Sequence, residues 1–289
     1  IAREVLNSGI YLRCHLEDIT RADFYGFVVP LVTKLMELSR EANIPVKVRA
    51  CDTLGLGVPY GGVAVPRSVQ KIIYGLRTIC GVPSDLIEWH GHNDFYSVVD
   101  NSATAWLYGA SSVNTSLLGI GERTGNCPLE AMVFEYAQLK GNTGNMDLHV
   151  ITELAEYFSK EMKYDIPTRT PFVGREFNET RAGIHADGML KDEEIYNAFD
   201  TDKILGKPIV VAVNQYSGHA GIAAWINTYY KLKDSDKVDK KDKRVNKIKL
   251  WVDEQYKSGR TTMIGNNELE LLVKKLMPEI VEKKEERAS

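Results

Sequence analysis

Two histidines, His90 and His92, lie two residues apart in the run His90-Gly91-His92-Asn93-Asp94. Residues two apart on a β-strand share a face, so both imidazoles can reach one divalent cation. The amide and carboxyl groups that follow can orient such ligands. We therefore interpret His90 and His92 as candidate metal ligands. The alternative is a pair of structural histidines that neighbouring groups satisfy.

Polar residues also cluster after two earlier apolar segments. Glu17, Asp18 and Arg21 follow the first segment. They form either a charged site or a simple helix cap, because acidic residues favour the first helical turn. Asp52 and Thr53 follow the second segment. The Thr53 hydroxyl can bind a carboxylate or begin a turn, and the spacing leaves both alternatives open.

A glycine-rich run, Gly119–Asn126, follows the fourth apolar segment. It interleaves three glycines with Glu122, Arg123 and Asn126, at a spacing that differs from the dinucleotide fingerprint. Glycines let the backbone approach a ligand closely, while the side chains between them offer polar groups. The run is therefore either a ligand-binding loop or a structural turn.

Two further candidates lie later in the chain. His185 stands between glycines in the run Gly183–Gly188, and Tyr196 lies shortly beyond it. A histidine on a loop can serve as a base near neutral pH, although most such residues are ordinary surface groups.

The hydrophobic pattern predicts the scaffold that positions these residues. From residue 10 to about 140, short apolar segments alternate with amphipathic ones, which is the βα pattern of a parallel sheet or barrel. Each polar cluster falls at the carboxyl end of a strand, where such folds collect their chemistry. Pro30 is expected to kink the first helix. We predict strands at 10–16, 46–50, 86–89 and 112–117, and helices near 22–42, 67–79 and 95–108.

Beyond residue 140 the pattern changes to helices joined by loops. The stretch 231–244 is dense in lysine and aspartate, and we interpret it as a solvated connector. We predict helices at 147–164 and near 192–199, 218–230, 245–258 and 268–283.

Composition excludes several classes of function. The chain has 289 residues, 44% of them hydrophobic, and a net charge of -3 with no basic face for nucleic acid or membrane. Its four cysteines are far apart and form no Cys-x-x-Cys pair, which favours a reducing, cytoplasmic setting. No apolar run approaches the roughly 20 residues that span a bilayer. Small metabolites are the expected partners.

Five motifs taken together carry a resemblance. In this combination and order the chain resembles the metal-dependent isopropylmalate and homocitrate synthase family, with its DRE-TIM metallolyase-type barrel. Within that family it most resembles the citrate (Re)-synthase branch. The motifs are Glu17-Asp18-x-x-Arg21, Asp52-Thr53, His90-Gly91-His92-Asn93-Asp94, Gly119-Ile120-Gly121-Glu122-Arg123-Thr124-Gly125-Asn126 and Gly183-Ile184-His185-Ala186-Asp187-Gly188.

The resemblance implies an α/β fold: the C-terminal half of a TIM (β/α)8 barrel, about strands 5 to 8, followed by α-rich subdomains. We expect a partial barrel at 1–145, a linker helix and first subdomain at 146–235, and a helical C-terminal subdomain at 236–289. The family's first strand carries an Arg-Asp-Gly-type motif with a further metal ligand. Because Ile1 is not a start methionine, we expect that motif upstream.

The resemblance also implies a chemistry. A divalent cation (Mn²⁺, Mg²⁺ or Zn²⁺) on His90 and His92 would chelate a 2-oxo acid, and acetyl-CoA would add to its carbonyl before the thioester is hydrolysed. Oxaloacetate giving citrate is the expected reaction, in a homodimer that exchanges subdomains. By resemblance, Thr53 and Arg21 bind the 2-oxo acid, Glu17, His185 and Tyr196 are catalytic, and Glu122 and Asn126 lie near the acyl-CoA or the metal.

Three alternatives remain at this point. The substrate can be that of a homocitrate or 2-isopropylmalate synthase. The chain can be a truncated relative that binds metal without catalysis. A lyase running carbon–carbon cleavage on a related barrel is the third, although the Gly183-Ile184-His185 motif favours the synthases.

Overall fold

The computed structural model describes residues 1–180, 193–232 and 234–282. The chain divides into two compact units, Ile1–Met146 and Asp147–Ser289, and each is described by itself. Among the described residues, the structure has no helix whose length and hydropathy would let it span a membrane.

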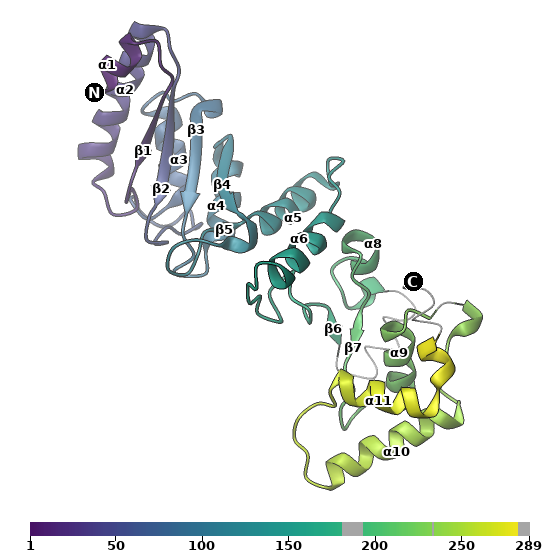
Figure 1. Ribbon diagram of the computed structural model, residues 1–289. Coiled ribbons are helices and arrows are strands. Elements are labelled where there is room, and N and C mark those ends of the chain that lie inside the picture. The colour runs from purple at the N-terminus through teal and green to yellow at the C-terminus, as the bar shows by residue number, and fades with distance from the viewer. Residues whose placement is uncertain (181–192, 233, 283–289) are drawn as a thin grey trace. The chain divides into compact units, whose positions relative to one another are not determined.

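The first unit is built on a five-stranded parallel sheet (Figure 1). Its strands lie in the order of the sequence, which confirms the predicted α/β fold with a parallel sheet. The strands are β1 (Leu12–Leu16), β2 (Val46–Asp52), β3 (Ile87–Gly91), β4 (Ser112–Ser116) and β5 (Cys127–Pro128). The helices are α1 (Ala2–Asn7), α2 (Val29–Ala42), α3 (Val69–Thr78), α4 (Val98–Tyr108) and α5 (Leu129–Lys140), with short helical turns η1 (Phe24–Val28), η2 (Ser84–Leu86) and η3 (Leu117–Gly119).

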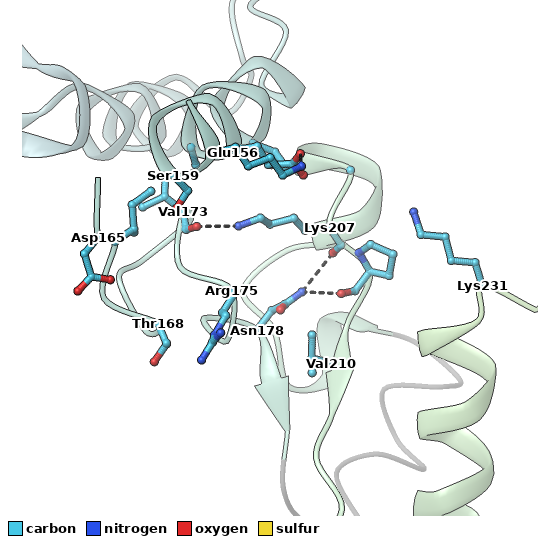
Figure 2. Close-up of a pocket in the computed structure, with 16 residues that line it drawn as sticks. Glu156, Ser159, Asp165, Thr168, Val173, Arg175, Asn178, Lys207, Val210 and Lys231 are labelled. Atoms are coloured by element: carbon cyan, nitrogen blue, oxygen red, sulfur yellow. Dashed lines mark hydrogen bonds and ion pairs between the residues drawn. The ribbon is translucent and has the colours of Figure 1, made fainter. Parts of the chain in front are cut away.

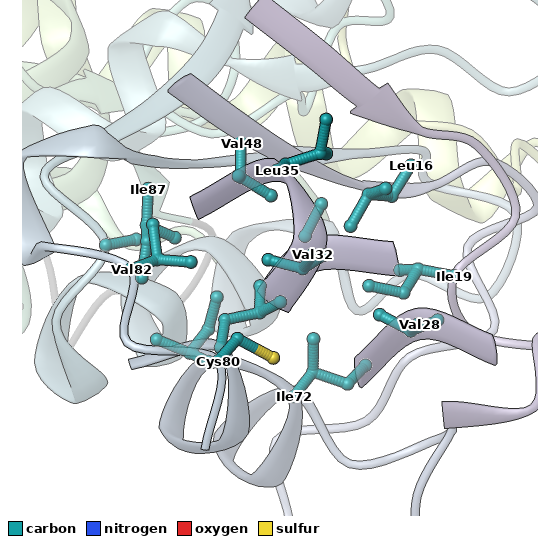
Figure 3. Packing of buried hydrophobic residues seen from close by; sticks show 14 of the residues in the cluster. Leu16, Ile19, Val28, Val32, Leu35, Val48, Ile72, Cys80, Val82 and Ile87 are labelled. Atoms are coloured by element: carbon teal, nitrogen blue, oxygen red, sulfur yellow. The ribbon is translucent and has the colours of Figure 1, made fainter. Parts of the chain in front are cut away.

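One face of this sheet carries the core of the unit. Alternate strand residues such as Leu16, Val48 and Ile87 are buried and pack against helical side chains that include Val32 and Ile72 (Figure 3). Because side chains alternate between the two faces of a strand, the same alternation sends the intervening residues to the opposite face.

The opposite face of the sheet is polar. Across it, Arg13 pairs with Lys47 and Arg49 pairs with Glu88 in the strand register. The Glu88 carboxylate lies 2.9 Å from Lys47 Nζ, 2.9 Å from Arg49 Nε and 3.3 Å from Arg13 Nη2. Three cations therefore surround one buried acid, and this polar face leads up to the histidine pair at the end of β3.

The expected helix at 22–42 is wrong at its beginning. Residues Phe24–Val28 form a π-helical turn in which the Asp23 carboxylate accepts a hydrogen bond from the Gly26 amide, and α2 starts only at Val29. Pro30 lies in the first turn of α2, directly after the π-helical turn. Proline is tolerated in the first turn of an α-helix.

The second unit has a core of its own, formed by buried residues from Val211 to Ile280. It also contains a two-stranded parallel sheet, which the expectation of helices and loops did not include. Those strands are two residues each, too short for a period-two pattern to show. The elements are α6 (His149–Lys160), β6 (Glu179–Thr180), η4 (Glu193–Ile195), α8 (Thr201–Leu205), β7 (Val210–Val211), α9 (His219–Tyr229), η5 (Asp234–Asp236), α10 (Lys243–Lys257) and α11 (Asn266–Leu276).

Candidate functional site

The two histidines lie side by side at the carboxyl end of β3. His90 is within the strand, and His92 follows it and forms an isolated bridge with Asn126. The imidazole centroids are 5.1 Å apart, with the rings at 88° to one another. The His92 amide donates to the Asp52 carbonyl oxygen (3.3 Å), which fixes the backbone beside β2. The spacing argument from the sequence therefore describes the geometry correctly.

The ring nitrogens of the pair fit a metal site. His90 Nδ1 lies 2.8 Å from Asn114 Oδ1. An amide oxygen only accepts, so the Nδ1 proton points to Asn114 and the Nε2 lone pair is left for a cation. His92 Nδ1 is buried and has no hydrogen-bond partner among the described residues. Burial lowers the pKa of His90, which favours the neutral, ligand-competent imidazole. Imidazole donors of this kind suit Zn²⁺.

Asn126 closes one side of the pair. Its Nδ2 donates to the Gly91 carbonyl oxygen at 3.2 Å and lies 3.5 Å from His92 Nε2. This places the Asn126 side-chain amide beside His92, while the Asn126 backbone belongs to the glycine-rich run.

Glu17 and Thr53 contact each other across the ends of β1 and β2. Thr53 Oγ1 donates to Glu17 Oε2 at 2.9 Å and accepts from the Asp18 amide at 2.8 Å. Arg21 donates from Nε to both Asp18 carboxylate oxygens at 2.9 Å. The cluster therefore contains an ion pair and a hydroxyl–carboxylate pair, and the acid that caps the following helical turn is Asp23 rather than Glu17 or Asp18.

Asp52 organises the backbone that carries Thr53. Its carboxylate is fully buried and accepts from Thr20 Oγ1 (2.8 Å) and from the amides of Leu56 (2.8 Å) and Gly57 (2.9 Å). Burial raises the pKa of this carboxyl, and these three hydrogen bonds act in the opposite direction. A Cβ on Gly57 would lie 2.8 Å from Asp52 Oδ2, so only glycine allows this close approach. The loop after β2 is thus tied down at its root.

Arg123 joins three strand-end loops. Its Nε lies 2.8 Å from Asp94 Oδ1, and its Nη2 donates to the Thr53 carbonyl oxygen at 2.6 Å. The Asn93 amide donates to the Gly125 carbonyl oxygen at 3.0 Å. Gly125 has φ +95°, and a Cβ there would lie 2.2 Å from the Gly119 carbonyl oxygen. The glycines therefore allow a compact turn that delivers Arg123 to its partners.

Of the three remaining predicted site residues, only Glu122 belongs to the first unit. Glu122 is exposed, and its carboxylate lies 4.0 Å from Arg123. Tyr196 belongs to the second unit, follows η4 and is 49% exposed. His185 lies outside the described residues.

Two residues of the site were missed from the sequence. Asn114, the partner of His90, is on β4, and Arg13 begins the polar face on β1. The sequence does contain a signal for these two residues, because polar residues alternate with apolar ones along β1 to β4. The polar residues of this alternation are Arg13, Lys47, Arg49, Glu88, His90 and Asn114. Period-two alternation of this kind marks a second, polar face.

A cavity of about 540 Å³ lies in the second unit, and its walls come from that unit alone. Figure 2 shows Lys207 pointing at the Val173 carbonyl and Asn178 pointing at the backbone of residues 207 and 208. Lys207 Nζ lies 2.9 Å from the Val173 oxygen and 3.2 Å from the Gly174 oxygen, while Lys160 pairs with Glu156. These cations are engaged in holding the fold, so we do not place the reaction there.

The family model described as HMGL-like matches residues 3–157, which is more than half of the chain. The chain belongs to the HMGL-like family. The matched residues include the whole sheet of the first unit and the histidine pair, so the HMGL-like part of the chain and the candidate site coincide.

Individual relatives are also similar. The citrate (Re)-synthase of Clostridium kluyveri is 78% identical over 289 residues, which are 100% of this chain and 64% of that protein. The citrate (Re)-synthase of Syntrophus aciditrophicus is 50% identical over 97% of this chain and 44% of that protein. The chain thus spans less than two thirds of the length of both relatives. A solved HMG-CoA lyase of Bacillus subtilis is 21% identical, covers 57% of this chain and 54% of its own, and has a TM-score of 0.42.

Proposed function

We propose that this chain forms the metal-binding part of an acyltransferase that condenses acetyl-CoA with oxaloacetate to give citrate. The observation that carries the proposal is the histidine pair: His90 is oriented by Asn114, and His92 has a buried ring nitrogen with no partner among the described residues. The similarity to two proteins named citrate (Re)-synthase supports oxaloacetate as the 2-oxo acid.

In this proposal His90 and His92 hold a divalent cation, Mn²⁺, Mg²⁺ or Zn²⁺. When bound, the cation supplies Lewis-acid polarisation of the 2-oxo acid carbonyl. Asn126 packs beside His92 and limits how its ring can turn. Asn114 does the same for His90, because it accepts the Nδ1 proton.

The remaining residues bind substrate and handle the proton. Thr53 would donate its hydroxyl hydrogen to the substrate carboxylate in place of Glu17, its present acceptor. The Glu17 carboxylate could then accept the proton that leaves the acetyl methyl group, a step that needs a positioned base. We assign that chemistry jointly to Glu17, His185 and Tyr196. Arg21 is the second proposed carboxylate contact, and Glu122 and Asn126 are proposed to lie near the acyl-CoA or the metal.

The proposal extends to the architecture. The first unit is taken as the C-terminal half of a TIM barrel, a partial barrel over 1–145, and its parallel strands in sequence order support this. The regions 146–235 and 236–289 are taken as the first subdomain with its linker helix and as the helical C-terminal subdomain. A homodimer that exchanges these subdomains and a cytoplasmic location complete the proposal.

An assay of CoA release tests the function, using the protein at its natural length with Mn²⁺, acetyl-CoA and one 2-oxo acid at a time. We expect activity with oxaloacetate. We expect the His92→Ala variant to lose most of it, because outer-shell changes alone cost about 10–100-fold at metal sites. His219→Ala is the matched control, since His219 hydrogen-bonds Asn246 in the second unit and is expected to have no role.

The outcomes separate the alternatives. Activity with 2-oxoglutarate alone would indicate a homocitrate synthase, and activity with 2-oxoisovalerate alone would indicate a 2-isopropylmalate synthase. Metal binding without CoA release from any of the three acids would favour the non-catalytic relative.

A further inference from the structure

A second group of metal-ligating side chains lies on the polar face of the first unit. His15 on β1, Glu17 just beyond it and Cys51 on β2 each offer one ligand atom, and these atoms all lie within 4.8 Å of one another. None of them was interpreted as a metal ligand from the sequence.

Strand geometry explains why the three meet. His15 and Glu17 are two residues apart and so share a face. His15 is opposite Arg49 in the β1–β2 register, and Cys51 is two residues beyond Arg49 on the same face. Cys51 is in turn opposite His90 across β2 and β3. The group is therefore adjacent to the histidine pair but uses none of its ring nitrogens.

Burial differs across the group in a way that suits a binding site. Cys51 is fully buried, whereas the side chains of His15 and Glu17 are 42% and 62% exposed. Burial holds the Cys51 thiol in place, whereas the exposed side chains of His15 and Glu17 can reorient to bind an entering ion. Bonds of about 2.0–2.3 Å bring tetrahedral donors within about 3.5 Å of one another, so a shift of roughly 1 Å suffices.

The donor set selects a class of cation. One thiolate, one imidazole and one carboxylate suit Zn²⁺ and Co²⁺, whereas Mg²⁺ and Mn²⁺ prefer oxygen. Three protein ligands leave the fourth tetrahedral position open to water. Metal binding would release the thiol proton to solvent.

We propose that His15, Glu17 and Cys51 form a second site, selective for thiophilic cations such as Zn²⁺ and distinct from the site at His90 and His92. An ion held there would be bound by the Glu17 carboxylate, which could then no longer accept the proton that leaves the acetyl methyl group. Occupancy therefore inhibits the condensation, a consequence that rests on the proposed function, whereas the binding itself does not.

Titration with Co²⁺ tests the binding without any assay of activity. A cobalt–thiolate bond gives a charge-transfer absorption in the near ultraviolet, which nitrogen and oxygen ligands do not give. We expect this absorption in the unaltered chain and in the His92→Ala variant, and its loss in Cys51→Ser. Cys14→Ser is the matched control, because Cys14 lies on β1 with its side chain on the opposite face, and it should keep the absorption.

His15→Ala supplies a second variant at an exposed position that does not endanger folding. It should weaken Co²⁺ binding about ten-fold or more, since even outer-shell changes cost that much. The proposal is overturned if the unaltered chain shows no charge-transfer absorption, or if the absorption survives in Cys51→Ser. These results concern binding only, so they are independent of whether CoA release is observed with oxaloacetate.

Discussion

Single side chains set the electrostatics of the polar sheet face. The Glu88 carboxylate is only 8% exposed and meets three cations, those of Arg13, Lys47 and Arg49. Burial by itself would raise the pKa of Glu88, but the hydrogen bonds from Lys47 and Arg49 outweigh it and hold the pKa below its ordinary value of 4.5. This carboxylate therefore stabilises the fold while it is ionised.

The pH dependence of that stabilisation has a definite sign. A depressed pKa contributes stability that is present above pH 4.5 and is lost as the pH falls through the lower, folded-state value. The variant Glu88→Gln should lower the free energy of unfolding at pH 7 by about 1–3 kcal/mol, because it removes the charge of a buried carboxylate that accepts hydrogen bonds from Lys47 and Arg49. Urea unfolding of the variant and the parent at pH 7 and at pH 3 measures this difference in the free energy of unfolding.

A surface acid is the control for Glu88. Glu37 pairs with Lys34 at 2.6 Å on an exposed helix face. Glu37→Gln should leave the urea midpoint at pH 7 unchanged, because exposed pairs contribute little. If Glu88→Gln behaved in the same way, the buried-acid account of this face would be wrong.

Asn114 is the residue that we expect to tune the metal site. Its amide oxygen accepts from His90 Nδ1 at 2.8 Å and so orients the imidazole. Asn114→Ala should weaken Mn²⁺ binding by about 10–100-fold without unfolding the chain, because partners of metal-bound histidines matter to that extent. Calorimetric titration with Mn²⁺ checks this, with Asn142→Ala, on a surface turn, as the control. An unchanged affinity would remove Asn114 from the site.

At the scale of elements, the candidate site depends on contacts between the loops that follow the strands. Arg123 is the link: its guanidinium bonds Asp94 in the loop after β3 and the Thr53 carbonyl in the loop after β2. The hydrogen bond from Arg123 lowers the pKa of Asp94, so the pair is ionised at neutral pH. Neither side chain is buried, so the expected role is positioning rather than global stability.

Arg123→Ala should therefore loosen the loops without unfolding the sheet. We expect faster amide hydrogen exchange at Asn93 and Asn126, whose amides donate to the carbonyls of Gly125 and Gly119, while β2 exchanges as before. Arg123→Lys should recover part of the protection, because one of the two contacts can still form. Equal rates of amide hydrogen exchange in the variant and the parent would show that the loops keep their structure without Arg123.

At the scale of the whole molecule, each unit has buried hydrophobic clusters of its own among the described residues. The buried cluster around Ile72 draws only on the first unit, and the cluster around Ile226 draws only on the second. Proteins of more than one unit commonly depart from a single cooperative transition. We therefore expect two thermal transitions by calorimetry.

Core variants assign those transitions. Ile72→Ala and Ile226→Ala each remove a fully buried side chain and should cost about 2–5 kcal/mol in their own unit. Each variant should lower one melting temperature and leave the other in place. A single transition that both variants shift equally would mean that the two units unfold together.

Local features of this protein can be predicted from its residues alone. Alternating apolar segments and amphipathic helices predicted a parallel sheet in the first unit, and the two-residue spacing of His90 and His92 predicted adjacent rings. These features depend on the periods of strands and helices, which a sequence displays directly. Local pattern failed at the start of α2 and at the short strands β6 and β7, where one turn or two residues decide the outcome.

Only the tertiary structure decided which distant residues meet. Asn114 reaches His90 across strands, Arg123 reaches Thr53 through a glycine turn, and Cys51 joins His15 by register. No period in the sequence encodes these contacts, because strand register and loop closure set them together. The histidine pair can be predicted from the sequence. Its orientation, its neighbours and the second cluster beside it are known only from the tertiary structure.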